Sequence, residues 1–297
     1  MAKPEKIGLI GPGLMGHGIG KNLLAKGYAL TVMGHRNRAP VEDLLAKGAK
    51  EAKTPRDLAA ASDLIFTVVG NSPQLEDIVF RDDGILAGLK PGAIMADCTT
   101  AMPESSLKIA AAVKAKGGRF VDTPMTRTPN EAEAGTLCLM TGGDEATLAE
   151  IRPVLECFAN LIIHCGGVGA GHAVKLVNNM VAIGTAAVVA EGFVAAMKSG
   201  IDLKAFRDVV TGGGANSVMF QRFASYVVDG DGGTARFAMA NASKDLRYFT
   251  HMVEALPMAA PMAQAAHQSL LMANAMGMGD EYILKLVDLA KKVNEKK

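Results

Sequence analysis

Residues 6–16 read KIGLIGPGLMG, and this stretch decides the fold. The short apolar run KIGLI is typical of a buried strand, and it passes directly into the pattern G-x-G-x-x-G. The first glycine allows a tight turn, the second lets the backbone approach a pyrophosphate, and the third allows a helix to pack closely on a strand. The turn comprises Gly11, Pro12, Gly13, Leu14, Met15 and Gly16. Because it follows a strand and opens a helix, it predicts a dinucleotide-binding site.

The first half of the chain alternates short β-branched runs with amphipathic helical stretches. Seven segments are predicted to be strands: 6–10, 29–33, 64–69, 93–96, 120–122, 137–141 and 161–164. Strands that alternate with helices are typical of an α/β protein with a Rossmann-type, doubly wound and mostly parallel sheet.

Strand signals nearly vanish after Gly171. An Ala- and Val-rich stretch from about 172 to 198 contains no proline and stops at Ser199-Gly200, which predicts one long helix linking two domains. We expect a nucleotide-binding Rossmann domain over 1–165 and an all-α domain for substrate binding and oligomerisation over 166–297. The apolar richness of 180–197 predicts burial all round, inside the helical domain or against another subunit.

Composition argues against several classes of partner. Lys and Arg number 31 against 30 Asp and Glu, so no global field favours nucleic acid or an acidic membrane surface. No uninterrupted apolar run approaches the roughly 20 residues that span a bilayer, which predicts a soluble protein. The N-terminal stretch MAKPEKIGLIG lacks the apolar core of a signal peptide, and four widely spaced cysteines suit reduced thiols, so we expect a cytoplasmic protein. The six histidines lack metal-ligand spacing, and no metal site is predicted.

The end of the second strand distinguishes NAD from NADP. An acid there accepts hydrogen bonds from the adenosine ribose but repels a 2′-phosphate. Here the sequence is Gly34-His35-Arg36, with no acid, and a guanidinium is a good partner for phosphate. NADP is therefore the expected cofactor. The alternative is a solvated basic loop, with NAD binding adequately without the acid.

Three polar residues interrupt the start of the long helix. Lys175, Asn178 and Asn179 stand at i, i+3 and i+4 and so share one face. Polar groups inside an apolar helix cost free energy unless they are hydrogen-bonded or useful. A lone lysine on a helix is usually solvated, but this trio favours a catalytic site.

Five segments together resemble the β-hydroxyacid dehydrogenase family, which includes 3-hydroxyisobutyrate, tartronate semialdehyde, succinic semialdehyde and sulfolactaldehyde oxidoreductases. They are IGLIGPGLMGHGIGKNL at 7–23, DCTT at 97–100, DTPMTRTPNEAEAGTL at 122–137, GHAVKLVNN at 171–179 and SKDL at 243–246. The resemblance implies that Lys175 is the catalytic lysine, that Asn179 helps it to bind substrate, and that Val69 and Thr100 lie near the nicotinamide. It also implies that Lys244 reaches the cofactor side of the site, and that the chain forms a homodimer or homotetramer.

The expected chemistry is hydride transfer between a nicotinamide and a small anionic substrate. Hydride transfer interconverts an alcohol and a carbonyl, so the alcohol proton needs an acid or base. A partly desolvated lysine serves in that role near neutral pH. We therefore expect an NAD(P)-dependent semialdehyde reductase or hydroxyacid dehydrogenase, of class EC 1.1.1.-, with Lys175 as general acid and base.

The substrate loop departs from the family pattern. The family usually reads D-x-P-V-S-G-G, whereas this chain has Thr126, Arg127 and Thr128 in the last three of those positions. An arginine flanked by two hydroxyls is suited to bind an anion, and the sulfolactaldehyde reductase type has an arginine-threonine pair in the corresponding place. A sulfonate, a phosphonate or a dicarboxylic semialdehyde is therefore favoured over 3-hydroxyisobutyrate. The alternative is a structural arginine paired with Glu131 or Glu133.

Two other functions remain open at this point. An NADPH-dependent imine reductase shares the architecture but typically lacks the lysine, so Lys175 argues against it. A dinucleotide-binding protein without turnover is the alternative from another class, and it predicts that Lys175→Ala changes nothing.

Overall fold

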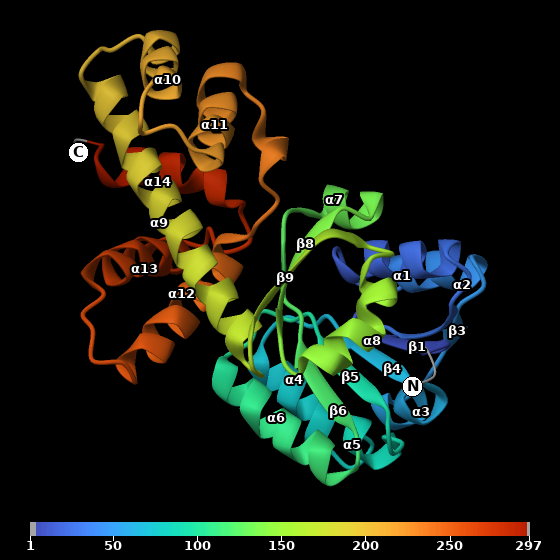
Figure 1. Cartoon of the computed structure of the whole chain (residues 1–297). Coiled ribbons are helices and arrows are strands. Elements are labelled where there is room, and N and C mark those ends of the chain that lie inside the picture. The colour runs from blue at the N-terminus through green and yellow to red at the C-terminus, as the bar shows by residue number, and fades with distance from the viewer. Residues whose placement is uncertain (1–3, 296–297) are drawn as a thin grey trace. The chain divides into compact units, whose positions relative to one another are not determined.

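The computed structural model describes residues 4–295, and the chain divides into two compact units, Met1–Lys175 and Leu176–Lys297. The first three residues of the N-terminal stretch discussed above lie outside the described part. Figure 1 labels the elements of both units.

The first unit is built on a nine-stranded sheet in the order β3-β2-β1-β4-β5-β6-β8-β7, with β9 also paired to β8. The strands are β1 Lys6–Ile10, β2 Ala29–Met33, β3 Lys50–Glu51, β4 Leu64–Thr67, β5 Ile94–Asp97, β6 Arg119–Asp122, β7 Met125–Thr126, β8 Leu137–Gly142 and β9 Ala159–Gly166. The pairs are parallel except β6 with β8 and β7 with β8. The prediction of a doubly wound, mostly parallel sheet is confirmed.

Helices cover both faces of this sheet (Figure 1). They are α1 Gly16–Ala25, α2 Ala39–Ala46, α3 Pro55–Ala61, α4 Ser72–Phe80, α5 Ile85–Gly88, α6 Pro103–Ala115, α7 Pro129–Ala134 and α8 Glu145–Leu155. Successive strand residues point to opposite faces. In β4, Leu64 and Phe66 belong to the core shared with α1, α2 and α8, while Ile65 belongs to the core shared with α3 to α6. This alternation produces two separate hydrophobic cores, one on each face.

The predicted long helix is α9, Ala170–Lys198. Within this chain it is not buried all round, because Val181 and Val188 are 60% and 70% exposed. Among residues 4–295, it is the one helix long and apolar enough to cross a membrane, with a mean hydropathy of 1.9 and 33% of that window buried. Glu191 interrupts its apolar stretch, so the expectation of no uninterrupted apolar run of roughly 20 residues is not contradicted, and the absence of a membrane span stays a prediction. One such helix is weak evidence for a membrane protein, since core helices of soluble proteins meet the same criteria.

The second unit is helical, as predicted. After α9 come α10 Leu203–Gly212, α11 Val218–Ala224, η1 Ser225–Asp229, η2 Gly232–Thr234, α12 Met239–Glu254, α13 Pro261–Ala275, η3 Ile283–Lys285 and α14 Leu286–Val293. Its core contains an aromatic cluster in which Phe193 stacks on Phe220 at 5.5 Å and meets Phe206 edge-on at 5.2 Å. Among the residues that the structure describes, the extended pairing in this unit is a single bridge between Ala238 and Tyr282.

Candidate active site

The glycine turn lies at the carboxyl end of β1, and each of its three glycines meets a different constraint. Gly11 has φ +89°, and a Cβ there would lie 2.2 Å from the Val68 carbonyl oxygen. A Cβ on Gly16 would lie 2.2 Å from the Gly11 carbonyl oxygen. A Cβ on Gly13 would meet nothing within 4 Å. The first and third glycines are therefore required by the protein's own packing, whereas the second borders open space.

This open space fits the pyrophosphate of a dinucleotide. α1 begins at Gly16, and within residues 4–295 the amides of Leu14, Met15 and Gly16 donate to no backbone carbonyl. Unpaired amides at a helix N-terminus favour anions. Leu14 is 69% exposed, Met15 packs against the core and Pro12 is buried, so the turn is anchored on one side and accessible on the other.

The loop after β2 lies beside this turn. Ile10 and Met33 are in register at the ends of β1 and β2, and the Gly11 amide donates to the Met33 carbonyl at 3.1 Å. His35 and Arg36 are exposed, and among the described residues no side chain is paired with Arg36. Arg38, by contrast, forms two hydrogen bonds to Glu51, at 2.6 and 2.9 Å. Of the two arginines in this loop, Arg36 is the one available to a ligand.

Gly34 contributes by its small size. A Cβ at this position would lie 2.2 Å from the Val41 side chain, so a larger residue would push α2 away from the end of β2. Gly34 therefore has a packing role in addition to its predicted place in the cofactor site.

Val69 and Thr100 stand at the carboxyl ends of two further neighbouring strands, β4 and β5. The Val69 amide donates to Thr99 Oγ1 at 3.2 Å, which joins the two loops. Both Val69 and Thr100 are partly exposed, whereas Thr99 is buried. The four loops that carry the predicted cofactor residues thus occupy one edge of the parallel sheet, where α/β folds bind ligands.

The loop of Thr126, Arg127 and Thr128 connects β7 to α7. Arg127 has φ +86° and is the one non-glycine residue with positive φ among residues 4–295. This backbone conformation favours glycine and costs a bulky residue about 1–2 kcal/mol. Its Nη1 donates to the Thr136 carbonyl and to Asn160 Oδ1, the latter at 2.7 Å. Its partners are therefore not Glu131 or Glu133, the pairing considered from the sequence.

Thr128 has a capping role in this structure. Its side chain accepts from the Asn130 amide at 3.3 Å, and Glu131 in turn accepts from the Thr128 amide at 2.9 Å. The two residues form a capping box at the start of α7. The Thr128 hydroxyl also donates to Glu131, so it is engaged within its own helix. Thr126 is half-buried and pairs with Cys138 in the β7–β8 ladder.

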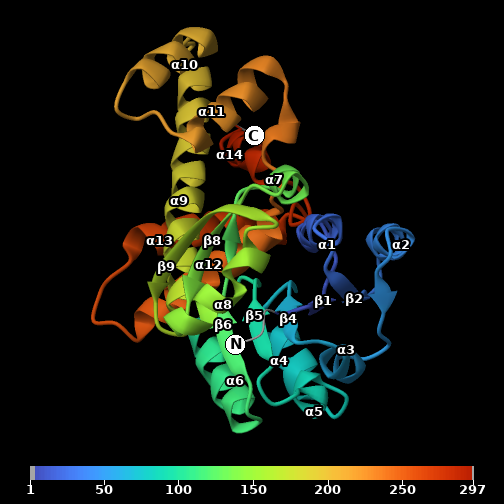
Figure 2. The same cartoon turned by 45° about the vertical axis from the view of Figure 1, so that its right-hand side comes forward.

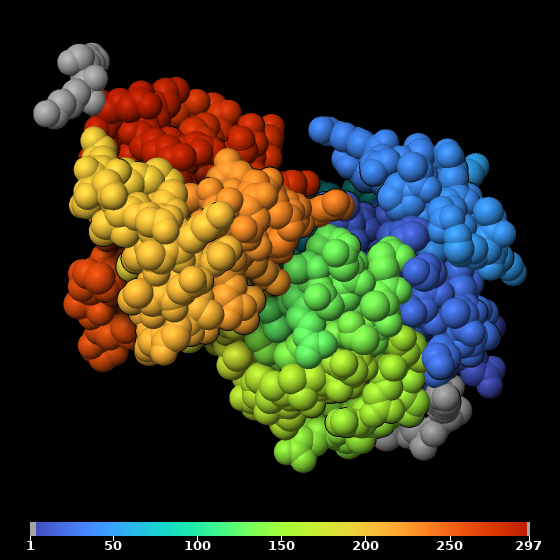
Figure 3. Space-filling model, turned by 90° about the horizontal axis from the view of Figure 1, so that it is seen from above, coloured from blue at the N-terminus to red at the C-terminus, as the bar shows by residue number. Residues whose placement is uncertain are grey.

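α7 is joined directly to α1, the helix that follows the glycine turn (Figure 2). A Cβ on Gly18 would lie 2.4 Å from the Ala132 backbone, and Asn22 donates to the Ala132 carbonyl at 3.0 Å. In the space-filling view the blue surface of the N-terminal segments adjoins the green surface of the segment that includes α7 (Figure 3). The helix that follows the predicted substrate loop is therefore packed directly on the predicted cofactor helix.

His17 strengthens this connection. Its Nδ1 lies 2.5 Å from Glu133 on α7, and its Nε2 lies 2.7 Å from Asp43 on α2. Burial alone would lower the pKa of His17, but the hydrogen bonds and charges of the two carboxylates outweigh it and raise that pKa. Lys21 also pairs with Glu133, at 2.7 Å. The imidazole thus links three helices around the glycine turn.

Lys175 belongs to the first unit, in the second turn of α9. The start of α9 is capped by a buried carboxylate: Asp122 Oδ1 accepts from the Gly169 amide at 2.7 Å, and Oδ2 accepts from the His172 amide at 2.9 Å. Charge-assisted caps of this kind stabilise a helix N-terminus. Lys175 is half-buried. Lys175 therefore follows closely in the chain the two residues whose amides Asp122 binds at the end of β6.

The other predicted polar residues lie in the second unit and meet at Asp245 of α12. Asn179 is 7% exposed and donates from Nδ2 to Asp245 Oδ2 at 2.6 Å. Lys244 Nζ lies 3.1 Å from Asp245 Oδ1 and 5.4 Å from the centre of the Tyr248 ring. Asn178 donates to Asn179 Oδ1 at 3.1 Å. The structure thus brings Asn178, Asn179 and Lys244 into one hydrogen-bonded and ion-paired group around a buried acid.

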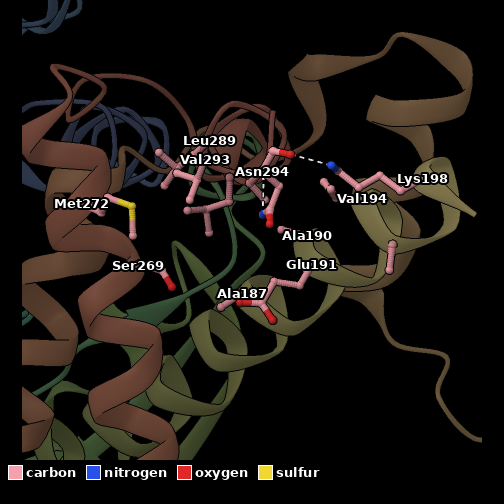
Figure 4. A pocket seen from close by; sticks show the side chains of 13 residues that line it. Ala187, Ala190, Glu191, Val194, Lys198, Ser269, Met272, Leu289, Val293 and Asn294 are labelled. Carbon is pink, nitrogen blue, oxygen red and sulfur yellow. Dashed lines mark hydrogen bonds between the residues drawn. The ribbon is translucent and has the colours of Figure 1, made fainter. Parts of the chain in front are cut away.

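A separate groove of about 470 Å³ in the second unit holds none of these residues (Figure 4). Side chains from α9, α13 and α14 line it, and Lys198 crosses its end to bond the Asn294 carbonyl at 2.5 Å. Its walls are mainly apolar, with Glu191 and Ser269 at the side (Figure 4). Within the part of the chain that the structure describes, no group of three or more His, Cys, Asp or Glu residues could hold a metal ion.

Comparison with known proteins assigns the family. Residues 6–167 match the model of the NAD binding domain of 6-phosphogluconate dehydrogenase, and residues 169–290 match that of the NAD-binding region of NADP-dependent 3-hydroxyisobutyrate dehydrogenase. 2-(Hydroxymethyl)glutarate dehydrogenase of Eubacterium barkeri is 35% identical over 95% of this chain and 93% of its own. The chain belongs to the β-hydroxyacid dehydrogenase family.

Two further members of this family match nearly the whole chain. Glyoxylate/succinic semialdehyde reductase 2 of Arabidopsis thaliana is 28% identical over 96% of this chain and 79% of its own. The solved structure of Mycobacterium tuberculosis 3-hydroxyisobutyrate dehydrogenase with L-serine is 27% identical, with a TM-score of 0.87 over 99% of this chain and 100% of that one. Membership makes this protein an NAD(P)-dependent hydroxyacid dehydrogenase.

Reasoning from the sequence overlooked three buried residues that hold predicted site residues or the segments that carry them, Asp122 and His172 in the first unit and Asp245 in the second. Asp122, His172 and Asp245 all lie inside the segments that carry the family resemblance, yet none was assigned a role. Each of them is an ionisable residue that lies within an apolar stretch or beside a predicted site residue, and this pattern could have pointed to them. Only the fold shows that Asp122 caps α9 and that Asp245 holds Asn179 and Lys244.

Proposed function

We propose that this protein is an NADP-preferring enzyme that interconverts a small anionic semialdehyde and its hydroxy acid, with Lys175 as general acid and base. The observation that carries the proposal is the place of Lys175 in the first unit. It follows a helix start fixed to the carboxyl edge of the sheet that bears the glycine turn. A half-buried lysine at this place can donate a proton as the ammonium and accept one as the neutral amine.

The glycine turn, Arg36, Val69 and Thr100 would hold the dinucleotide, whose nicotinamide supplies or accepts the hydride. In reduction, the ammonium of Lys175 donates a proton to the carbonyl oxygen as that oxygen gains electron density. In oxidation, the neutral amine of Lys175 accepts the alcohol proton. Asn178, Asn179 and Lys244 would bind substrate, and Lys244 would also contact the cofactor. Asp245 fixes the Asn179 amide and holds Lys244 by an ion pair.

Preference for NADP is supported by the loop after β2. Arg38 is committed to Glu51, which leaves Arg36 as the guanidinium for a 2′-phosphate. No carboxylate stands at Gly34, His35 or Arg36 to accept hydrogen bonds from an unmodified ribose.

An anionic substrate is supported by Arg127. Both hydrogen bonds of its guanidinium to the described residues use Nη1, and among those residues its Nε and Nη2 have no partner. A guanidinium fixed at one nitrogen offers its remaining edge for two parallel hydrogen bonds to a carboxylate, sulfonate or phosphonate. Thr126 would add a hydroxyl, whereas the engagement of Thr128 in the capping box makes its contribution indirect.

We also propose a cytoplasmic homodimer or homotetramer that binds neither membrane nor nucleic acid. Support for the assembly comes from α9, whose exposed valines would be covered by a second subunit. Sedimentation equilibrium tests this, and a monomer at micromolar concentration would contradict it.

The function is tested by the absorbance of the reduced nicotinamide with a panel of aldehydes. The panel holds carboxylated, sulfonated and phosphonylated semialdehydes and, as a matched control, uncharged aldehydes of the same chain length, each with NADPH and with NADH. We expect turnover of one or more anionic aldehydes, faster with NADPH. Absence of turnover with both cofactors would refute the enzyme proposal in favour of a binding protein. Equal turnover of charged and uncharged aldehydes would refute the anionic substrate.

A further inference from the structure

A fully buried polar cluster connects the loop after β5 to the start of α9. The side chains of Asp97, Asp122 and His172 have no exposed surface, and Thr99 and Ser106 are buried with them. All five residues belong to the first unit. A buried ionisable group costs free energy, and well-packed apolar residues in its place are often as stable or more so. We therefore expect this cluster to have a role other than stabilising the fold.

His172 lies at the centre of this cluster. Its Nε2 lies 2.9 Å from the Thr99 carbonyl, and because a carbonyl only accepts, Nε2 carries the proton. Its Nδ1 lies 2.6 Å from the hydroxyl of Ser106 on α6. Asp97 Oδ2, which has no hydrogen-bond partner among the described residues, lies 3.4 Å from Nε2. The imidazole thus bonds a loop carbonyl on one side and a helix on the other.

The same residue is fixed through its backbone. The His172 amide donates to Asp122 Oδ2, and the Cβ that an alanine would add at Gly171 would lie 2.4 Å from the Met140 carbonyl oxygen. The first turn of α9 is therefore in contact with β6 and β8 without room for movement. A displacement of the His172 side chain would be transmitted to α9 rather than absorbed by a gap.

Lys175 and Thr100, two residues assigned to the proposed reaction, are close in the chain to His172 and Thr99. Lys175 follows His172 by three residues, one turn along the same helix. Thr100 follows Thr99, and Thr99 Oγ1 also accepts from the Val69 amide. The His172 bond to the Thr99 carbonyl therefore couples the helix that carries the proton donor to the loops expected at the nicotinamide.

We propose that His172 is a positioning residue that sets the place of Lys175 relative to the two loops that carry Val69, Thr99 and Thr100. This inference rests on the proposed function. Misplacement of a reacting group by about 1 Å costs roughly 100-fold in rate. The role requires a side chain that donates to the Thr99 carbonyl, which glutamine supplies and leucine does not.

The test compares His172→Leu and His172→Gln with wild type, and uses His267→Leu as a matched control. His267 is a second buried histidine, on α13 of the second unit. We expect His172→Leu to lower kcat about 10- to 100-fold while the dinucleotide Kd changes little. With deuterated reduced cofactor its isotope effect on kcat should rise, because hydride transfer limits the rate. His172→Gln should recover most of the loss, and His267→Leu should show none of these changes.

Hydrogen exchange in the protein without cofactor gives a readout independent of activity. In His172→Leu, peptides covering 97–106 and 169–176 should lose protection together, while peptides of α8 keep theirs. If His172→Leu does not fold, Ser106→Ala, which removes one hydrogen bond, should lower kcat by a smaller factor and raise the isotope effect.

Three results would overturn the inference. The first is a wild-type kcat and isotope effect in His172→Leu, or in Ser106→Ala where only that variant folds. The second is a loss in His172→Gln equal to that in His172→Leu, and the third is unchanged exchange in both peptides. If wild type turns over no aldehyde, the proposed function fails and this inference fails with it.

Discussion

Substituting the glycines of the turn one at a time separates the packing of the fold from the binding of the dinucleotide. Gly13→Ala adds a methyl group where nothing lies within 4 Å, at a position without positive φ. Such a change is neutral or stabilises by up to about 1 kcal/mol. Gly16→Ala adds the same group 2.2 Å from the Gly11 carbonyl oxygen. Overpacking against backbone costs about 1–3 kcal/mol.

These energies predict opposite outcomes in two assays. In calorimetry without cofactor, Gly16→Ala should lower the Tm by roughly 2–12 °C, whereas Gly13→Ala should leave it unchanged or slightly raised. In titration with the dinucleotide, Gly13→Ala should weaken binding roughly 5- to 150-fold, if its methyl group occupies pyrophosphate space at a cost of about 1–3 kcal/mol. Gly214→Ala, at an exposed position with nothing within 4 Å and no positive φ, controls for loss of a glycine alone.

The reasoning would be refuted by either of two results. Wild-type affinity of Gly13→Ala for both NAD and NADP would mean that the open space beside Gly13 does not receive the pyrophosphate. A drop in Tm for Gly13→Ala as large as that for Gly16→Ala would mean that the distances at the turn do not govern its packing.

Three further substitutions test the surroundings of this turn. Because the pKa of His17 is raised in the folded protein, its bonds to Glu133 and Asp43 stabilise the fold fully below pH about 6.5 and less as the pH rises through the folded-state pKa. The difference in Tm between wild type and His17→Gln should therefore shrink as the pH rises. A difference in Tm that stays constant over this pH range would contradict the role of His17. Arg127→Ala should raise the KM for an anionic aldehyde about 10-fold or more at unchanged cofactor Kd, and an unchanged KM would remove Arg127 from the substrate site. Arg36→Ala should weaken NADP more than NAD, whereas equal losses would exclude contact with the 2′-phosphate.

The sequence predicted those features that depend on local periodicity. All seven predicted strands, β1 and β2 among them, matched within about two residues because apolar runs bounded by glycine or polar residues are a local signal. β3 and β7, each two residues long, were missed because so short a segment has no period. The start of α9 was placed two residues late, since its cap comes from Asp122 on a strand far earlier in the chain.

In the candidate site, too, local contacts could be predicted and long-range contacts could not. The glycine turn could be predicted from its local sequence, since Gly16 meets the Gly11 carbonyl five positions away, whereas the contact of Gly11 with the Val68 carbonyl could not. The partners of Arg127 could not be predicted, since Thr136 and Asn160 reach it through the pairing of β8 and β9. The same holds for the bond of His172 to Thr99, which joins residues 73 positions apart. Long-range contacts of this kind depend on the order of strands in the sheet, which cannot be derived from a single sequence.

The central claim is that Lys175 handles the proton of a hydride-transfer reaction, and Lys175→Met tests it most directly. Methionine keeps the length and most of the packing of the lysine stem but neither accepts nor donates a proton. Turnover of the best aldehyde from the panel and the dinucleotide Kd would be measured on the same preparation. The account predicts a loss of kcat of about 100- to 10,000-fold with the Kd for the dinucleotide within a few-fold of wild type. Turnover by Lys175→Met at the wild-type rate would contradict it.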